Sequence, residues 1–181
     1  ELHTPQWRVA ANGQRQHPDR LVIDLDPGPG TGLPQCVELA HLLREVLGGM
    51  GLVCVPVTSG SKGIHVYAGL DGQLSSGEAS ELAKQLAVSL ESLRPDLVVS
   101  NMAKTQRDGK VLIDWSQNNA NKTTVAPYSL RGRLRPFVAV PRNWDELTPD
   151  LRHLELDELP ARLATIGDPM SALAPTAGPP A

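Results

Sequence analysis

The stretch RLVIDLDPGPG, residues 20–30, constrains the fold more than any other part of the chain. Its run LVID, residues 21–24, is typical of a buried strand. Asp24 and Asp26 stand two positions apart, and alternate residues of a strand point to the same face of a sheet. The turn that follows is rich in Pro and Gly and ends the strand. The sequence therefore predicts a buried strand with two carboxylates side by side at its end.

Two neighbouring carboxylates repel each other, and each is costly to remove from water. A divalent cation relieves both effects, and oxygen ligands suit Mg²⁺ or Mn²⁺. Asp114 ends a second apolar strand, in VLIDWSQ at residues 111–117, so we expect all three carboxylates at the same edge of a sheet. Three convergent carboxylates are typical of a two-metal phosphoryl-transfer site. The alternative is a strand end in solvent, with Asp26 starting a turn.

The segment TSGSKGIH, residues 58–65, has the composition of a phosphate-binding turn. Small residues in a turn expose backbone N–H groups and hydroxyls, which phosphate binding needs. Lys62 adds a positive charge, and His65 lies on the strand that follows. The spacing differs from that of the P-loop, and no capped helix follows. An ordinary hairpin turn with a solvated lysine is therefore the alternative.

A further segment, APYSLRGR at residues 126–133, carries two arginines in alternation. On an extended chain Arg131 and Arg133 share a face, and the forked guanidinium suits phosphate. The alternative is an exposed edge strand protected by its charges. Seven basic residues stand against two acidic ones between Lys104 and Arg135, in a chain whose net charge is −3. The overall charge excludes a generally basic nucleic-acid coat protein but allows a local basic groove.

Periodicity predicts an α+β fold with mixed, mainly antiparallel sheets flanked by helices. Helices are expected at 35–46 and 78–93, the second capped by Ser75 or Ser76, and shorter ones within 143–154 and 157–167. Strands are expected at 21–24, 52–59, 64–70, 97–100 and 111–116, with an edge strand in 5–10 and an extended segment at 123–132. Residues 1–167 are expected to form one domain, and the Pro/Ala/Gly-rich residues 168–181 a tail or linker.

Apolar residues make up 40% of the chain but aromatic residues only 3%, so the core is expected to consist mostly of Leu, Val, Ala and Ile. Cys36 and Cys54 lack the spacing of a metal site and are expected as buried thiols in a reducing cytosol. The sequence contains no signal peptide and no membrane-spanning segment. We therefore expect a cytoplasmic protein without a membrane partner.

Taken together and in order, the motifs LVIDLDPG, VTSGSKGIHVY and VLIDWSQNNANKTTVAPYSLRGR resemble those of one family. This family is the polymerase domain of bacterial ATP-dependent DNA ligase D, which belongs to the archaeo-eukaryotic primase superfamily and serves non-homologous end joining. The resemblance runs from ELHTPQW at the start to about residue 165. It implies a primase-polymerase catalytic core.

The resemblance implies a role for each motif. The two catalytic metals, Mn²⁺ or Mg²⁺ with Mn²⁺ usually preferred, would be bound by Asp24, Asp26 and Asp114. The incoming nucleotide would be bound by His3, Ser59, Lys62, His65, Gln117 and Arg131, with His3 near the sugar. DNA would be contacted by Lys104, Arg107 and Arg133, with Arg107 on a mobile loop that engages the template-primer end and helps to organise the site.

The implied reaction is nucleotidyl transfer, in which a primer 3′-hydroxyl attacks the α-phosphorus of a nucleoside triphosphate and pyrophosphate leaves. Members of the family favour ribonucleotides. Implied partners are DNA ends, nucleoside triphosphates, Ku and the ligase and nuclease domains of the same system, in the bacterial cytoplasm with the nucleoid. The family's domain has a further segment before the ELH position, with a pocket for a 5′-phosphate, which we expect this chain to lack. Two alternatives are a catalytically weak DNA-end-binding module and a D-x-D aspartate phosphatase. Pro27 and Gly28 count against the phosphatase, which needs a small hydroxyl residue or Val after its second Asp.

Overall fold

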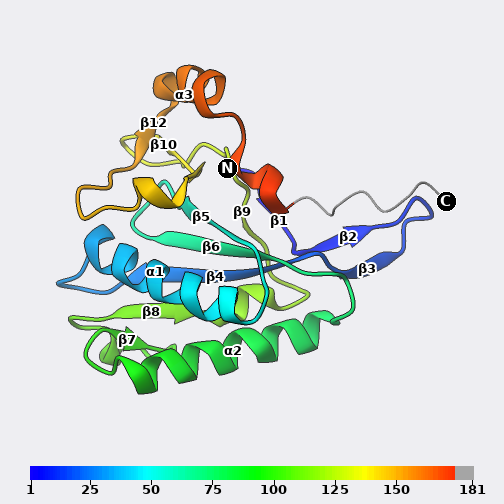
Figure 1. Ribbon diagram of the computed structural model, residues 1–181, viewed down its shortest axis with the longest axis horizontal. Helices are drawn as coiled ribbons and strands as arrows, with labels where there is room; N and C mark the ends of the chain where they lie inside the picture. Colours follow the sequence, from blue (N-terminus) through cyan, green and yellow to red (C-terminus); the bar gives the residue numbers. More distant parts are fainter. Residues whose placement is uncertain (174–181) are drawn as a thin grey trace.

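The computed structural model describes residues 1–173, so residues 174–181 of the expected tail lie outside the described part. A six-stranded sheet forms the centre of the molecule (Figure 1). Its strands follow the order β11 (Val140–Pro141), β5 (Cys54–Thr58), β6 (Ile64–Gly69), β4 (Arg20–Pro27), β8 (Val111–Asp114) and β7 (Val98–Val99). All neighbours are antiparallel except β7 and β8, which are parallel. The predicted α+β class with a mixed, mainly antiparallel sheet is confirmed.

Two long helices, α1 (Leu33–Gly49) and α2 (Ser76–Leu93), cover one face of this sheet. Leu21, Ile23 and Leu25 of β4 point toward them and are fully buried in the main core. The alternate residue Val22 belongs to a smaller cluster on the other face, together with Tyr67 and others. Because successive side chains of a strand alternate, Asp24 and Asp26 lie on the face away from the helices.

The N-terminus of α2 is fixed by a capping box. The Ser75 hydroxyl accepts a hydrogen bond from the Glu78 backbone N–H at 3.3 Å, and the Glu78 carboxylate accepts one from the Ser75 N–H at 2.8 Å. Ser75 rather than Ser76 is therefore the cap, one of the two positions that the sequence offered. Helix α1 begins two residues earlier than predicted, with Pro34 in its first turn, where a missing N–H costs nothing.

The C-terminal third differs from the prediction. The segment 143–154 contains one 3₁₀ turn, η3 (Trp144–Glu146), and ends in β12 (Leu154–Glu155), which pairs with β10 (Phe137–Val138). A helix over 143–154 was wrong because Pro149 has no N–H to donate and its ring clashes with the preceding turn. The expected helix at 157–167 is present as η4 (Leu156–Glu158) followed by α3 (Leu159–Ile166).

Short elements complete the described chain. Residue 168 leads into η5 (Pro169–Leu173), whose Met170 and Leu173 pack on the cluster around Val22. The predicted edge strand is β2 (Trp7–Val9), which forms a hairpin with β3 (Arg15–Pro18) that projects from the sheet in Figure 1. Within the expected extended segment only β9 (Thr124–Val125) is a strand, and it pairs with β1 (His3–Thr4). Two further 3₁₀ turns are η1 (Lys104–Gln106) and η2 (Trp115–Asn118).

Candidate active site

The three predicted carboxylates lie on adjacent strands. In the register of β4 with β8, Asp24 stands directly opposite Asp114, and in the register with β6 it stands opposite His65. Asp26 follows two residues further along the same face of β4. Directly opposite residues of antiparallel strands have Cβ atoms about 5 Å apart. The sheet therefore brings four of the predicted residues together. Asp114, Asp24 and His65 lie side by side across three neighbouring strands, and Asp26 lies next to Asp24 on the same face.

Each carboxylate has a different neighbour as its partner. An oxygen of Asp24 lies 3.4 Å from His65 Nε2, and one of Asp26 lies 3.6 Å from the guanidinium of Arg107. Asp114 accepts hydrogen bonds from the Ser116 backbone N–H at 3.0 Å and from the Gln117 amide at 3.2 Å. Within residues 1–173, no three Asp, Glu, His or Cys side chains are oriented so as to enclose a metal ion. The side chains thus share a face without forming a closed ligand set.

The charge on Asp24 is strongly disfavoured. Burial, followed by the charges of Asp114 and Asp26, raises the pKa of Asp24 to about 8. Such mutual repulsion is what a divalent cation relieves, and carboxylate oxygens are the ligands that Mg²⁺ and Mn²⁺ prefer. The oxygen donors of the three carboxylates therefore suit hard divalent cations, although within residues 1–173 they are not arranged to enclose one.

The turn at residues 59–63, called here the phosphate turn, packs tightly on β4. The buried Ser59 hydroxyl accepts hydrogen bonds from the backbone N–H groups of Ser61, at 3.3 Å, and Gly63, at 3.2 Å. A Cβ atom at Gly63 would overlap the carbonyl oxygen of Leu25. Only glycine allows this approach, so the backbone of the turn is held against the strand that carries the carboxylates.

Lys62, in the phosphate turn, and His65, on the strand after it, have different surroundings. Lys62 lines a cavity of about 500 Å³ together with the turn 27–33 and His153. His65 is only 4% exposed, and its Nδ1 has no hydrogen-bond partner among the described residues. Burial, and then the charge of Arg131, lowers the pKa of His65 to about 3, so the imidazole is neutral at pH 7. It can donate one hydrogen bond and accept another, but it supplies no positive charge.

Arg131 and His3 are joined by a carboxylate that the sequence reasoning missed. Glu1 accepts a hydrogen bond from the Gly132 N–H at 2.8 Å, and its oxygens lie 3.6 Å from Arg131 Nε and 3.2 Å from His3 Nε2. The hydrogen bond from Gly132, then that with His3, lowers the pKa of Glu1 to about 2. The pairing of β1 with β9 positions His3, and with it Glu1, near Arg131.

The basic loop at residues 104–110 is fastened to the turn after β4. Gly28 donates its N–H to the Lys110 carbonyl at 2.9 Å, and Gly109 donates to the Pro29 carbonyl at 2.8 Å. Arg107 faces Asp26, as described above, and also donates to the Met102 carbonyl at 2.7 Å. Lys104 is exposed and makes no side-chain hydrogen bond or ion pair within residues 1–173, so the structure brings Arg107 but not Lys104 to the carboxylates.

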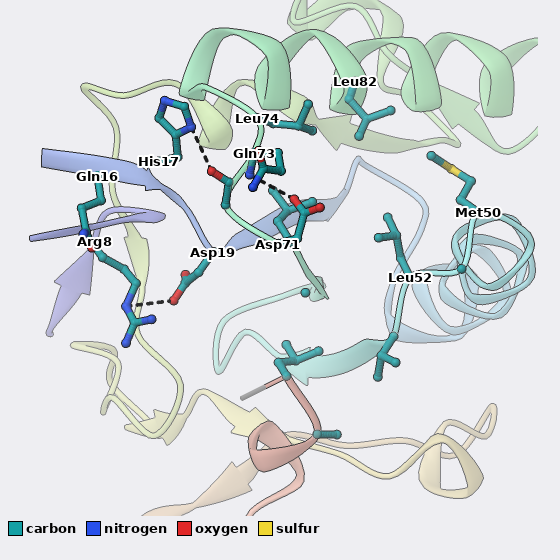
Figure 2. Close-up of a pocket in the computed structure, with 17 residues that line it drawn as sticks. Arg8, Gln16, His17, Asp19, Met50, Leu52, Asp71, Gln73, Leu74 and Leu82 are labelled. Atoms are coloured by element: carbon teal, nitrogen blue, oxygen red, sulfur yellow. Dashed lines mark hydrogen bonds and ion pairs between the residues drawn. The ribbon is translucent and has the colours of Figure 1, made fainter. Parts of the chain in front are cut away.

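A larger cavity lies elsewhere on the described chain. It measures about 960 Å³ and opens at the start of β4 and the end of β6, away from the phosphate turn (Figure 2). Apolar side chains such as Leu52 and Leu82 face the ion pair between Arg8 and Asp19, whose atoms lie 3.4 Å apart. None of the predicted site residues lines it. Chemistry rather than size therefore identifies the candidate site.

Comparison with known proteins decides the family. Residues 1–170 match the family model described as LigD, primase-polymerase domain. The chain belongs to this family. The multifunctional non-homologous end joining protein LigD of Mycolicibacterium smegmatis is 50% identical in an alignment 181 residues long, which covers 98% of this chain and 24% of that protein. The LigD protein of Mycobacterium tuberculosis is 52% identical over 179 residues, 96% of this chain and 24% of that protein.

A solved member of the LigD polymerase family has the same fold. The polymerase domain from Mycobacterium tuberculosis Ligase D, in complex with DNA, superposes with a TM-score of 0.91 and 50% sequence identity. The superposition covers 94% of this chain and 62% of that one. The chain thus spans about a quarter of the length of its curated relatives and about three fifths of the solved domain. No helix within residues 1–173 is long and apolar enough to cross a membrane.

Within this LigD-family site, the sequence reasoning also missed Ser116 and Lys122. The Ser116 hydroxyl donates to Asp114 at 2.5 Å, and the Lys122 ammonium donates to the Ser116 hydroxyl. With Gln117 they hold the third carboxylate in place. Their role could have been predicted from the sequence after Asp114, because polar residues follow the end of this strand closely. Arg133, predicted to contact DNA, donates to the Ser61 hydroxyl at 3.1 Å and so lies beside the phosphate turn.

Proposed function

We propose that this chain is the core of a DNA-directed nucleotidyltransferase, which adds nucleotides to a primer 3′-hydroxyl at DNA ends or gaps during non-homologous end joining. One observation carries the proposal: Asp24 and Asp114 face each other across two strands, with Asp26 beside them, and burial together with the charges of these two neighbours raises the pKa of Asp24 to about 8. Family membership and a solved relative in complex with DNA support it.

In this proposal Asp24, Asp26 and Asp114 hold two Mn²⁺ or Mg²⁺ ions. When bound, the ions supply a lowered pKa for the primer hydroxyl and charge stabilisation for the departing pyrophosphate. The attack on the α-phosphorus proceeds in line, and positioning provides much of the rate. The three carboxylates fix the reacting groups on a rigid strand pair rather than on a loop.

The other predicted residues bind the nucleotide and DNA. The phosphate turn, with Ser59 and Lys62, binds the triphosphate, and Arg131 adds a guanidinium on its other side. His65 contributes a hydrogen bond without charge, and His3 lies near the sugar. Gln117 keeps Asp114 oriented, at 3.2 Å. In the proposal, DNA is contacted by three basic side chains, the exposed Lys104 and Arg133 and the partly buried Arg107.

The longer system is also a proposal. The curated relatives are multifunctional non-homologous end joining proteins, and this chain spans 24% of them. We propose that the domain works beside ligase and nuclease activities and with Ku, in the bacterial cytoplasm with the nucleoid. Ribonucleoside triphosphates are the proposed substrates. Family membership gives no support to the alternative of an aspartate phosphatase.

A second function is a DNA-end-binding module with weak catalysis. It is favoured by the separate partners of the three carboxylates, above all by the pairing of Asp26 with Arg107 at 3.6 Å. In this case the domain holds an end without extending it. The two functions make the same prediction for DNA binding and opposite predictions for extension.

Primer extension on a gapped duplex with Mn²⁺ and ribonucleotides tests the proposal. The chain is expected to extend the primer, and Asp114→Asn is expected to abolish extension while DNA affinity changes little. Asp71→Asn, at the far end of β6, serves as the control and should extend normally. Full extension by the Asp114→Asn protein contradicts the three-carboxylate site. Binding without extension by the unaltered chain supports the end-binding module instead.

A further inference from the structure

A basic hairpin at residues 130–138 stands beside the candidate site. Leu130 pairs with Val138, and the Arg131 N–H donates to the Phe137 carbonyl at 2.9 Å. Its tip carries Leu134, flanked on both sides by arginine. Leu134 is 106% exposed, more than any other large apolar residue that the structure describes. We call this segment the arginine hairpin.

The fold gives no reason for a leucine at this tip. A side chain that buries no surface adds no hydrophobic stabilisation to the folded state. Tight turns favour Gly, Asn, Asp, Pro and Ser, each for a backbone reason that leucine does not meet. Single exposed apolar residues are common on protein surfaces, so exposure alone carries no argument. The argument rests on where this leucine is held and on what surrounds it.

The arginine hairpin is anchored on the phosphate turn. Gly60 has φ +67°, and a Cβ atom there would lie 2.7 Å from the Arg131 side chain and 2.8 Å from the Val138 backbone. Nearer the tip, Arg133 donates to the Ser61 hydroxyl at 3.1 Å. Gly132 donates its N–H to Glu1, as described above. These contacts fix the base of the hairpin, so Leu134 projects into solvent next to Arg133, which contacts the phosphate turn.

The charges around Leu134 suit a nucleic-acid strand. Within residues 1–173, Arg133 forms no ion pair with a carboxylate, and its partner is the neutral hydroxyl of Ser61. Arg135 lies over the Phe137 ring at 5.6 Å and pairs with Glu155 at 2.6 Å. Arginines beside an apolar side chain can hold phosphates while the apolar group reaches the bases. Leucine is one of the residues that insert between base steps and unstack them.

We propose that Leu134 is a wedge that contacts the bases at the end of a DNA duplex, beside the point of nucleotide addition. The inference rests on the proposed function, because it needs DNA at this site. It adds to that function a means of separating the terminal base from its neighbour. In this proposal Arg133 and Arg135 bind DNA phosphates on either side of Leu134. The contacts at the base of the arginine hairpin hold the leucine in its exposed position.

Fluorescence of 2-aminopurine tests the wedge without relying on catalysis. The base analogue is placed in the template strand of a gapped duplex, at the position next to the primer end, and brightens when it is unstacked. The whole chain at saturating concentration is expected to increase the fluorescence. Leu134→Ser is expected to give less than half of this increase, while its Kd for DNA, measured by anisotropy, stays within about threefold.

A matched control is Leu93→Ser, at the end of α2, where the leucine is 61% exposed but belongs to a helix on the other face of the sheet. It should behave like the unaltered chain. The wedge is overturned if the Leu134→Ser protein increases the 2-aminopurine fluorescence as much as the unaltered chain does. It is also overturned if the unaltered chain binds DNA without increasing the fluorescence. Neither result contradicts the proposed function. If the unaltered chain binds no DNA, the proposed function fails, and the wedge fails with it.

Discussion

At the scale of single residues, Asp24 combines structural cost with a proposed function. Its pKa is raised to about 8, far above the value near 4 that an unfolded chain gives it. The folded state therefore binds a proton more tightly than the unfolded state. Folding stability is expected to fall as pH rises from about 4 to about 8, because the unfolded state releases that proton first.

Removing this carboxyl group is expected to stabilise the metal-free protein, because its ionisation at neutral pH favours the unfolded state. At pH 7.5 with a chelator, Asp24→Asn should raise the melting temperature, whereas Asp71→Asn, on the surface, should leave it unchanged. Added Mn²⁺ should raise the melting temperature of the unaltered chain and have little effect on Asp24→Asn. Thermal denaturation followed by circular dichroism measures all three. A lower melting temperature for Asp24→Asn in chelator contradicts the repulsion described here.

Arg131 is the residue whose loss should affect nucleotide binding most selectively. Its side chain is 15% exposed and points toward the site, whereas that of Arg135 is 76% exposed. A hydrogen bond to a charged group contributes about 1.5–3 kcal/mol, so Arg131→Ala should raise the nucleotide KM by about ten- to a hundredfold. Arg94→Ala is the control, because Arg94 pairs with Glu38 and Asp96 at the end of α2 and lies outside the proposed site. Steady-state kinetics with varied nucleotide make the comparison, and an unchanged KM for Arg131→Ala excludes it from the nucleotide site.

At the scale of elements, two glycines bring separate segments into contact. Gly63 allows the phosphate turn to touch the backbone of β4, and Gly28 allows the turn after β4 to touch the basic loop at Arg107. The positions of the phosphate turn and of the basic loop relative to the carboxylates therefore depend on the absence of two Cβ atoms.

Gly63→Ala should destabilise the fold and disturb the site together. Its Cβ would meet backbone rather than a flexible side chain, and overpacking of this kind costs about 1–3 kcal/mol. Gly49→Ala is a matched control, since nothing lies within 4 Å of its added Cβ at the end of α1. Urea denaturation should show the loss of unfolding free energy for Gly63→Ala alone. Equal stability of the two variants would contradict the close approach.

Elements were predictable where local chemistry decides them. The apolar period of 3.6 gave α1 and α2, and the alternation around Asp24 gave β4. The prediction failed at 143–154, where the apolar spacing suggested a helix but Pro149 and the pairing of β12 with β10 prevail. The opposition of Asp24 and Asp114 is a matter of strand register, which depends on contacts distant in sequence. Glu1 was missed for the same reason, because β1 reaches the site by pairing with β9.

At the scale of the whole molecule, charge is distributed unevenly. The chain has a net charge of −3, yet arginines and lysines gather around the carboxylates through Arg107, Lys122, Arg131 and Arg133. An acidic protein with a basic site repels DNA from most of its surface and attracts it at one place. If the domain acts on DNA ends as proposed, its orientation there would follow from charge before any specific contact forms.

The salt dependence of DNA binding measures this arrangement. The logarithm of Kd should rise linearly with the logarithm of the salt concentration. Arg133→Ala should reduce the slope of this line by about 0.9. Arg94→Ala is the control, because Arg94 pairs with Glu38 and Asp96 at the end of α2. Anisotropy titrations at several salt concentrations give the slopes. A slope that Arg133→Ala leaves unchanged removes this arginine from the phosphate contacts.

Strand β4 has a consequence for how this protein can change in evolution. Its odd-numbered residues Leu21, Ile23 and Leu25 build the main core, while its even-numbered Asp24 and Asp26 belong to the site. Inserting or deleting one residue before Asp24 would exchange the two sets, turning carboxylates into the core and leucines into the site. Such a change cannot be rescued by stabilising mutations elsewhere, because it removes the fold and the chemistry in one event. Length variation is therefore expected in the β2–β3 hairpin and in the loops, and not within this strand.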